Sequence, residues 1–373
     1  MSERSLAGKE KGCKLVALAI GIVLPLGLSA TASAEHAGSN GKPAVDLTIP
    51  SYAAKPGLSG GIAIAGSDTM QPILGKVASA FRQWQPEVKI AVQGGGSDAA
   101  LQGFLQNQAT IRRGDASFKG HHVSGHVALL ASSRALTAGE REDFRSRYGY
   151  EPTEIPIALD AVAIYVNRQN PIQGLTMEQL DAIFGKDRKR GLPEMITQWG
   201  QVGLRDGWEQ QPIRLYGRDK GSGTRSFLIH EALLNGELRG DVREEIGSAS
   251  VILALSRDPL GIGYAGIGFQ ASTVRVVPLA EKAGMPFVAP SAESAAHGTY
   301  PLSRFLYLYA NKAPNSELDP EVLEFLKFVN SREGQEAVIK AGVYPVPASQ
   351  VGKNLETLLG GTVTAASPDA SPR

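Results

Sequence analysis

Predicted strands and helices alternate along most of the chain. The apolar run at residues 62–65 predicts a strand, and apolar residues at helical spacing between 70 and 81 predict the helix that follows. The same order recurs after a strand at 213–216. Two further alternating strands are predicted at 157–167 and 305–311, far apart in the sequence. This alternation predicts an α/β fold with largely parallel sheets.

Several strand-to-helix junctions carry glycine together with serine, threonine or aspartate. Residues 66–69 and 94–98 have this composition, and the turn at 131–134 has two serines and an arginine. In α/β sheets, ligands bind outside the carboxyl ends of the strands, near helix N-termini. The same residue types are ordinary helix N-caps, so any single junction has a purely structural explanation. Their recurrence favours a binding site.

The loop at 217–224, Gly-Arg-Asp-Lys-Gly-Ser-Gly-Thr, is the clearest binding motif. Its glycines let the backbone turn tightly and expose N–H groups. Its hydroxyls add donors, and Arg218 adds a planar, permanently charged fork. A following helix would point the positive end of its dipole at the same place. Because all these groups donate, we predict that the loop holds a small oxyanion.

The N-terminus has the pattern of a cleavable signal peptide. Basic residues precede an apolar stretch at 15–28, and the small residues after it match a cleavage site, which predicts a signal peptide over 1–34. Cys13, the only cysteine, would leave with it, so no disulfide or cysteine metal site is expected. Residues 35–57 and 351–373 lack periodicity and are predicted to form a flexible lead-in and tail.

Other kinds of function have weaker support. The net charge of +1 gives no basis for a nucleic-acid or acidic membrane partner. The glycines at 261–266 match a dinucleotide pattern without a following helix, so a tight turn in a core strand is preferred. His121, His122 and His126 suggest a metal site, since His122 and His126 are four residues apart. A stable helix is not expected there and no carboxylate is placed as a third ligand, so a solvated loop is preferred. No nucleophile–base pair is evident, and no cofactor is predicted.

Asp68 is the unusual member of these junctions, because a carboxylate should repel an anion. It fits only if the anion carries a proton to donate, as inorganic phosphate does near neutral pH and sulfate does not. An acceptor there would select phosphate, and such buried polar discrimination can reach roughly 10⁴-fold.

Together these motifs resemble the periplasmic phosphate-binding proteins of ABC transporters, two-lobed solute-binding proteins of the type II class. The resemblance runs over about residues 60–347. Its most specific part is the Arg-x-x-Gly-Ser-Gly-Thr loop at 218–224, supported by the Gly-Ser/Ala-x-Thr-x-x-Pro turn at 66–72 and the glycine-serine turn at 95–98. Weaker matches lie at 175–184, 261–264, 300–302 and 328–335.

The resemblance implies a periplasmic-binding-protein type II fold, with two α/β lobes joined by two hinge strands near Asp160 and Arg304. One lobe would comprise 58–158 and 302–350, and the other 159–301. The phosphate ligands that it implies are Asp68, Thr69, Ser97, Ser133, Arg218, Ser222, Gly223 and Thr224.

One position departs from the family pattern. Ser133 stands where some members have an aspartate that accepts the phosphate proton. Either Asp68 or Asp98 would take this role, and Asp68 is preferred. Arg134 could be a second anion ligand or a salt-bridge partner.

The predicted function is binding of inorganic phosphate between the lobes and its delivery to an ABC permease in the inner membrane. The expected protein is a periplasmic monomer without a metal or cofactor, and not an enzyme; export beyond the periplasm stays open. Two alternatives are a secreted phosphatase on the same scaffold, and a phosphate sensor or surface-interaction protein without a transport role.

Overall fold

The computed structural model describes residues 43–106, 110–111 and 125–360 of the 373-residue chain. Some predicted features lie outside these ranges: the signal peptide 1–34, Cys13, His121 and His122. Within the described residues, no helix is both long enough and apolar enough to span a membrane.

The described residues form one large sheet of nine strands in the order β2-β1-β5-β13-β6-β10-β8-β9, with β11 also paired to β6. Its strands are β1 (Gly60–Gly66), β2 (Val88–Gln93), β5 (Leu129–Ser132), β6 (Thr153–Asn167), β8 (Arg214–Arg218), β9 (Arg243–Glu245), β10 (Gly261–Gly266), β11 (Val274–Val277) and β13 (Ser303–Ala310). Shorter pairs are formed by β3 (Thr110–Ile111) with β4 (Gly125–His126), and by β7 (Leu175–Thr176) with β12 (Leu279–Ala280).

The sheet is mixed, so the prediction of largely parallel sheets is correct only in part. β1 pairs in parallel with β2 and β5, and β8 pairs in parallel with β9 and β10. We call these two sets the β1 side and the β8 side. β13 is antiparallel to β5 and β6, and β10 is antiparallel to β6. Because the chain leaves the β1 side along β6 and returns along β13, these two strands run in opposite directions.

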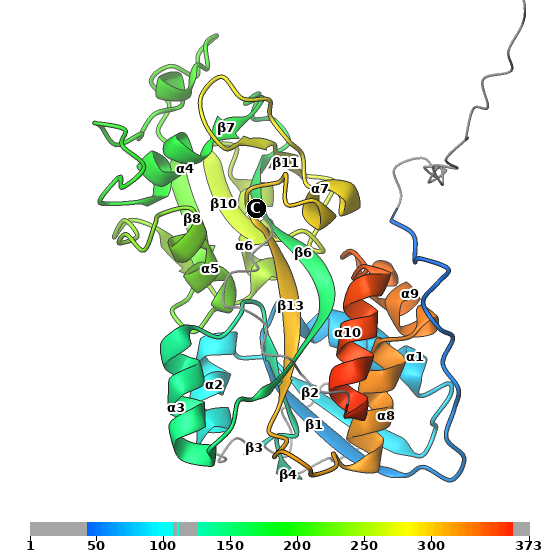
Figure 1. Ribbon diagram of the computed structural model, residues 1–373. Coiled ribbons are helices and arrows are strands. Elements are labelled where there is room, and N and C mark those ends of the chain that lie inside the picture. Colours follow the sequence, from blue (N-terminus) through cyan, green and yellow to red (C-terminus); the bar gives the residue numbers. More distant parts are fainter. Residues whose placement is uncertain (1–42, 107–109, 112–124, 361–373) are drawn as a thin grey trace, which may run out of the picture. The chain divides into compact units, whose positions relative to one another are not determined.

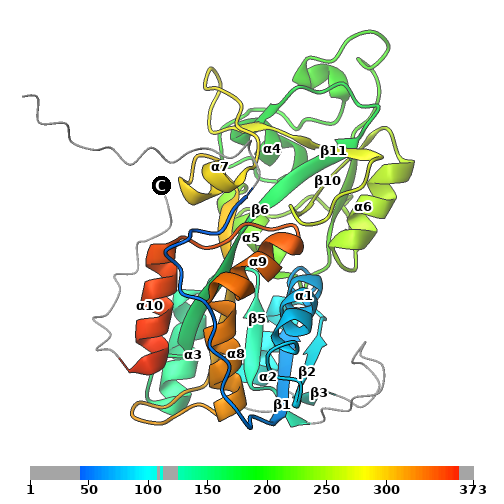
Figure 2. The ribbon, with the colours of Figure 1, turned by 90° about the vertical axis from the view of Figure 1, so that its right-hand side faces the viewer.

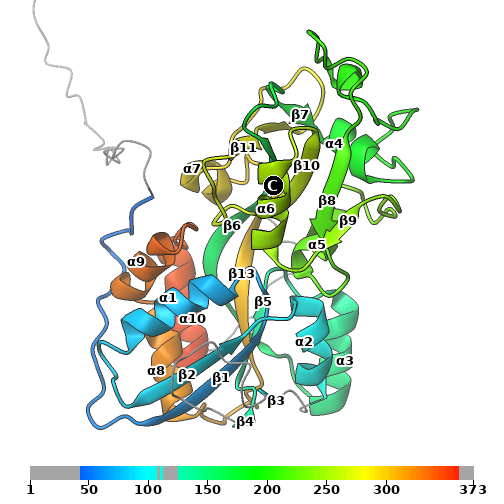
Figure 3. The same cartoon turned by 180° about the vertical axis from the view of Figure 1, so that it is seen from behind.

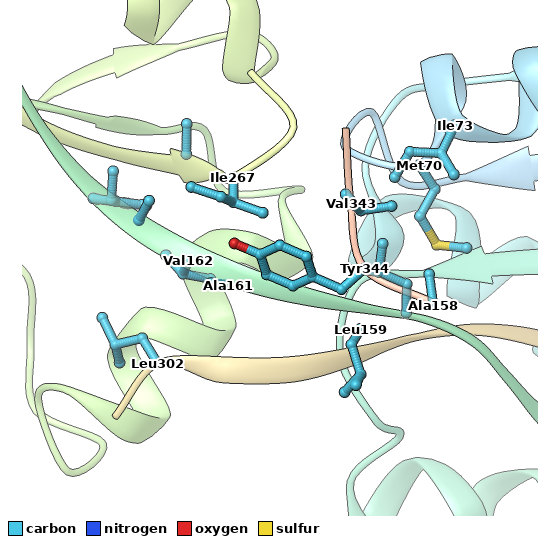
Figure 4. Close-up of a cluster of buried hydrophobic side chains, with 14 of the residues drawn as sticks. Met70, Ile73, Ala158, Leu159, Ala161, Val162, Ile267, Leu302, Val343 and Tyr344 are labelled. Carbon is cyan, nitrogen blue, oxygen red and sulfur yellow. The ribbon is translucent and has the colours of Figure 1, made fainter. Parts of the chain in front are cut away.

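The long strands β6 and β13 join the two sides (Figure 1). β6 is buried along almost its whole length, as its run of alanine, valine and isoleucine predicts. Figure 4 shows Met70 and Val343 near Ala158 on one part of β6, and Ile267 near Val162 further along. The apolar core is therefore continuous between the sides. The exact lobe boundaries stay a prediction.

Helices cover both faces of the β1 side (Figures 1 and 3). α1, α8 and α9 pack together on one face, and α2 and α3 pack on the other. On the β8 side, α6 packs against β8 and β10. The helices are α1 (Gln71–Phe81), α2 (Ser97–Leu105), α3 (Ala138–Tyr148), α4 (Met177–Phe184), α5 (Gly223–Glu231), α6 (Ser248–Arg257), α7 (Ala292–Ala296), α8 (Pro320–Val329), α9 (Arg332–Lys340) and α10 (Ala348–Leu359), with the 3₁₀ helix η1 (Trp199–Val202).

The predicted flexible lead-in is wrong for residues 43–57. Tyr52 is buried, and its ring packs edge-on against Phe328, with the ring centroids 5.2 Å apart. Burial raises the pKa of Tyr52 to about 12, so its hydroxyl stays protonated and donates to Glu324 Oε2 at 3.2 Å. The backbone N–H of Tyr52 donates to Glu333 Oε2 at 2.7 Å. Tertiary contacts that composition does not reveal order this segment.

The predicted flexible tail is wrong for residues 351–359, which belong to α10. This helix packs beside α8 (Figure 2). Val351 of α10 clusters with Ile49 of the lead-in. The Asn354 amide donates to Pro156 O at 2.7 Å and to Asn330 Oδ1 at 2.6 Å. Val351, Asn354 and Leu358 are buried on one face at helical spacing, so the composition of the tail was a misleading guide to its structure.

Tyr52→Ala is expected to lower the free energy of unfolding by about 3–5 kcal/mol, the usual cost of removing a buried aromatic side chain. Tyr52→Phe keeps the ring and removes only the hydroxyl, so a loss of about 1 kcal/mol is expected. Urea unfolding of both variants measures the difference. An unchanged midpoint for Tyr52→Ala would show that the lead-in adds nothing to the core.

Candidate functional site

Four helix N-termini meet where strands of the two sides end. α1 follows β1 and α2 follows β2, while α5 follows β8 and α6 follows β9. Their first turns or the residues just before them provide Thr69, Ser97, Thr224 and Ser248, all buried. Helix N-termini carry unpaired N–H groups and the positive end of the helix dipole. This convergence creates a site suited to an anion.

A pair of threonines joins the two sides at this place. Thr69 Oγ1 of the β1 side lies 3.0 Å from Thr224 Oγ1 of the β8 side. Thr69 Oγ1 also lies 3.5 Å from Ser248 Oγ. Thr69 is 1% exposed and Thr224 is 0% exposed, so these hydroxyls exchange hydrogen bonds away from solvent.

Arg218 lies at the end of β8 with its side chain 1% exposed. Its Nη1 donates to Ser248 Oγ at 3.0 Å, and its Nη2 donates to Asp68 Oδ2 at 3.2 Å. Its Nε is buried and has no hydrogen-bond partner among the described residues. Burial lowers the pKa of Arg218, while the charges of Asp68 and Asp219 oppose that change. The site thus contains a buried cation with donor capacity left over.

Asp68 links the two sides through both carboxylate oxygens. Oδ1 accepts the Gly95 N–H at 2.7 Å, and Oδ2 accepts from Arg218 across the site. Asp68 is therefore held by a cation and a backbone donor. These bonds offset part of the repulsion that an isolated carboxylate would exert on a bound anion.

Ser97 and Ser133 form a second hydroxyl pair on the β1 side. Their Oγ atoms lie 3.2 Å apart, and the Ser133 N–H donates to Ser97 Oγ at 3.1 Å. They face the first residue of α5, since a Cβ added to Gly223 would lie 2.6 Å from Ser97 Oγ and 2.9 Å from Ser133 Oγ. Ser222 caps α5 by accepting the Arg225 N–H at 3.4 Å. The structure thus brings together the residues that the resemblance names.

The two backbones also approach closely at glycines. A Cβ added to Gly96 would lie 2.1 Å from Gly221 O, and Gly96 has a φ of +97° that disfavours other residues. The Asp98 N–H donates to Gly221 O at 3.1 Å. Glycine at these junctions therefore allows the β1 side and the β8 side to meet.

Asp98 and Arg134 form a separate polar cluster beside the site. Asp98 Oδ1 accepts from Arg134 Nε at 2.9 Å, and Asp98 Oδ2 accepts from the hydroxyl of Ser226 on α5. Burial alone would lower the pKa of Arg134, but its hydrogen bond to Glu140 and the charge of Asp98 raise it. Arg134 is thus a salt-bridge partner, and Asp98 joins α2 to α5.

Sequence reasoning missed Ser248 and treated Arg304 and Asp160 only as hinge markers. Arg304 lies opposite Asp160 in the β13–β6 register. Its Nη2 donates to Asp160 Oδ2 at 2.7 Å and to Thr224 Oγ1 at 3.0 Å. The Gly247-Ser248 step repeats the glycine-serine signal of the other junctions, but the helix after it was not predicted. The partnership of Asp160 with Arg304 depends on strand register, which no local pattern reveals.

The weaker candidates behave as separate features. Gly261–Gly266 forms β10, a buried strand of the sheet, so the core strand is confirmed and the tight turn predicted within it is wrong. His126 is exposed. Within the described ranges, no cluster of three or more His, Cys, Asp or Glu side chains is arranged to hold a metal ion.

Comparison with known proteins agrees with the arrangement of strands, helices and site. Residues 31–333 match the family model described as PBP superfamily domain. The chain is 40% identical over 315 residues to the phosphate-binding protein PstS of Pseudomonas aeruginosa, covering 84% of this chain and 92% of that protein. The chain belongs to the phosphate-binding protein family of the PBP superfamily.

Solved structures show the same fold for this family. An ABC-type phosphate transport receptor from Vibrio cholerae matches with a TM-score of 0.56 and 25% identity, covering 76% of this chain and 99% of that one. A phosphate ABC transporter substrate-binding protein from Clostridium perfringens, with bound phosphate, matches with a TM-score of 0.61 and 22% identity, covering 77% and 100%. The described sheet is therefore the type II fold of the family.

Gly223→Ala is expected to force α2 and α5 apart, because the new Cβ would also lie 2.8 Å from Ser97 Cβ, which cannot rotate away. Overpacking of this kind costs about 1–3 kcal/mol of stability. Thermal unfolding and hydrogen exchange of the Asp98 amide measure the effect. Gly240→Ala is the matched control, since a Cβ there would meet nothing within 4 Å. Identical behaviour of the two variants would contradict the close packing.

Proposed function

We propose that the chain binds inorganic phosphate between the β1 side and the β8 side and delivers it to an ABC importer. The observation that carries this proposal is Arg218, a buried guanidinium with a free Nε, set among hydroxyls at four helix N-termini. The proposed ligands are the residues that the resemblance names: Asp68, Thr69, Ser97, Ser133, Arg218, Ser222, Gly223 and Thr224. Ser248 joins this set because Arg218 contacts it directly.

Donors dominate this set, which suits a tetrahedral oxyanion. Arginine has no acceptor, and the free N–H groups of a helix N-terminus only donate. Asp68 is the carboxylate that Arg218 bonds directly across the site. We propose that Asp68 accepts the proton of bound phosphate. Asp98 bonds Arg134 and Ser226, which lie outside the proposed ligand set, whereas Asp68 bonds Arg218 within it; this favours Asp68 over Asp98 for the role.

The role in transport rests on the relatives. The Pseudomonas aeruginosa relative is named a phosphate-binding protein, and the Vibrio cholerae structure is an ABC-type phosphate transport receptor. With the predicted signal peptide 1–34, they support a periplasmic protein that hands phosphate to a membrane permease, and we propose that it does so as a monomer. The proposed lobes, 58–158 with 302–350 and 159–301, would close around the anion by movement of β6 and β13.

Binding is favoured over hydrolysis by the partners of the site hydroxyls. Thr224 and Ser248 accept hydrogen bonds from arginines, which do not act as general bases. His230 is exposed and contacts Glu231. An assay with p-nitrophenyl phosphate separates the alternatives, since turnover lost on substitution of Asp68 would establish a phosphatase.

Arg218→Ala is expected to weaken phosphate binding by roughly 100-fold or more, because charged hydrogen bonds contribute about 1.5–3 kcal/mol each. Isothermal titration calorimetry of the mature protein measures the dissociation constants. Arg257→Ala is the control, since Arg257 is exposed in the last turn of α6, away from Ser248. Absence of heat with phosphate for the unmodified protein would reject the function, whereas full binding by Arg218→Ala would remove only Arg218 from the site.

Asp68→Asn is expected to reduce the preference for phosphate over sulfate. The acceptor is replaced by an amide that donates to either anion, so a preference of roughly 10⁴-fold should fall by at least about tenfold. Competition calorimetry with both anions gives the ratio. Asp98→Asn serves as the control and should leave the ratio unchanged. The opposite result, with only Asp98→Asn affecting selectivity, would assign the acceptor to Asp98.

A further inference from the structure

Arg304 is a buried cation on β13, outside the ligand set that the resemblance implies. Its side chain is 2% exposed, and that of its partner Asp160 is 0% exposed. We propose that Arg304 is a positioning residue for the phosphate site, which orients the Thr224 hydroxyl so that it donates its hydrogen to the anion. This inference rests on the proposed function.

The position of Arg304 is tightly determined. Its Nε and Nη2 donate to Asp160 Oδ2 at 2.9 and 2.7 Å. Asp160 is itself held, because Oδ1 accepts the Ile267 N–H at 3.2 Å. The Arg304 guanidinium lies over the Phe227 ring, 5.4 Å from its centroid. A guanidinium with these contacts has little freedom to move, so the remaining contact, from Nη2 to Thr224 Oγ1 at 3.0 Å, is directed.

That contact decides what the Thr224 hydroxyl can do. A hydroxyl has one hydrogen to donate, and arginine can only donate to it. Once Thr224 Oγ1 accepts from Arg304, its hydrogen must point elsewhere, toward Thr69 or a bound anion. Ser248 Oγ likewise accepts a hydrogen bond from Arg218 Nη1, and it lies 3.5 Å from Thr69 Oγ1. The two arginines thus occupy a lone pair on each of two neighbouring hydroxyls and direct the hydrogens of these hydroxyls away from themselves.

Arg304 also connects the site to the strands that join the two sides. β13 and β6 pass between the sides, and Asp160 and Arg304 face each other in their antiparallel register. Thr224 belongs to α5 on the β8 side, and it meets Thr69 of the β1 side. Any change in β13 near Arg304 would therefore change the orientation of a hydroxyl that contacts both sides.

The test must separate orientation of Thr224 from general damage. Arg304→Gln alone would leave Asp160 as an unpaired buried charge, which is strongly destabilising. The double variant Asp160→Asn with Arg304→Gln keeps a neutral cross-strand hydrogen bond. Arg304→Lys keeps the charge beside Asp160 but loses the planar guanidinium that contacts Asp160 and Thr224 together. Thermal unfolding confirms which variants are folded.

A double-mutant cycle with Thr224→Val provides the decisive readout. We expect the Asp160→Asn/Arg304→Gln variant and Thr224→Val each to weaken phosphate binding by about tenfold, which corresponds to the loss of one hydrogen bond. Because both act through one hydroxyl, their combination should also weaken it by about tenfold rather than by about 100-fold. Arg304→Lys should fall between the unmodified protein and the double variant. Thr357→Val on α10 is the control and should bind as the unmodified protein does.

The outcomes distinguish this inference from the proposed function. No phosphate binding by the unmodified protein would reject the function, and this inference with it. Phosphate binding by the unmodified protein, with additive effects in the cycle or no effect of the Arg304 variants, would overturn only the role of Arg304. If the double variant does not fold, the cycle of Arg304→Lys with Thr224→Val decides by the same criterion.

Discussion

The need to accommodate two buried guanidinium groups is the constraint on which the site depends. A buried charge is tolerated when it is paired and its N–H groups have acceptors. Asp68 pairs with Arg218, and Asp160 pairs with Arg304. The remaining acceptors are hydroxyls of α5 and α6. Since these groups come from the β1 side, the joining strands and the β8 side, the arginines have these partners only when all three are in place, and even then Arg218 Nε and Arg304 Nη1 have no acceptor among the described residues.

The Ser248 and Thr224 hydroxyls accept from the two arginines, and these contacts fix the direction in which each hydroxyl can donate. Ser248 accepts from Arg218, and Thr224 accepts from Arg304, so each hydroxyl is left with a hydrogen to donate. In the proposed site, neutral donors and helix N-termini would then face the anion, while much of the full charge is compensated nearby. This arrangement would also allow Asp68 to lie in the proposed anion site, because Arg218 and the Gly95 N–H already hold its oxygens.

Local motifs account for most of the site that was predicted. Asp68, Ser97 and Thr224 each follow a strand and precede or begin a helix, and such junctions are encoded by a few adjacent residues. Ser248 was missed because the helix it begins was not predicted, although its glycine-serine signal is the same. The lead-in and α10 were misjudged because their order comes from contacts such as Val351 with Ile49, which are distant in sequence.

The alternating elements, the glycine-serine junctions and the donor-rich loop at 217–224 can be recognised from local sequence, because each depends on neighbouring residues. Which of these elements meet is set by the packing of the folded chain. The antiparallel register of β6 and β13 sets Arg304 opposite Asp160, and the glycine contacts let Thr69 reach Thr224. The packing of the chain also places Asp98 in hydrogen bonds with Arg134 and Ser226, and Asp68 in a hydrogen bond with Arg218. Register and close approach are properties of the packed chain, so no local pattern contains them.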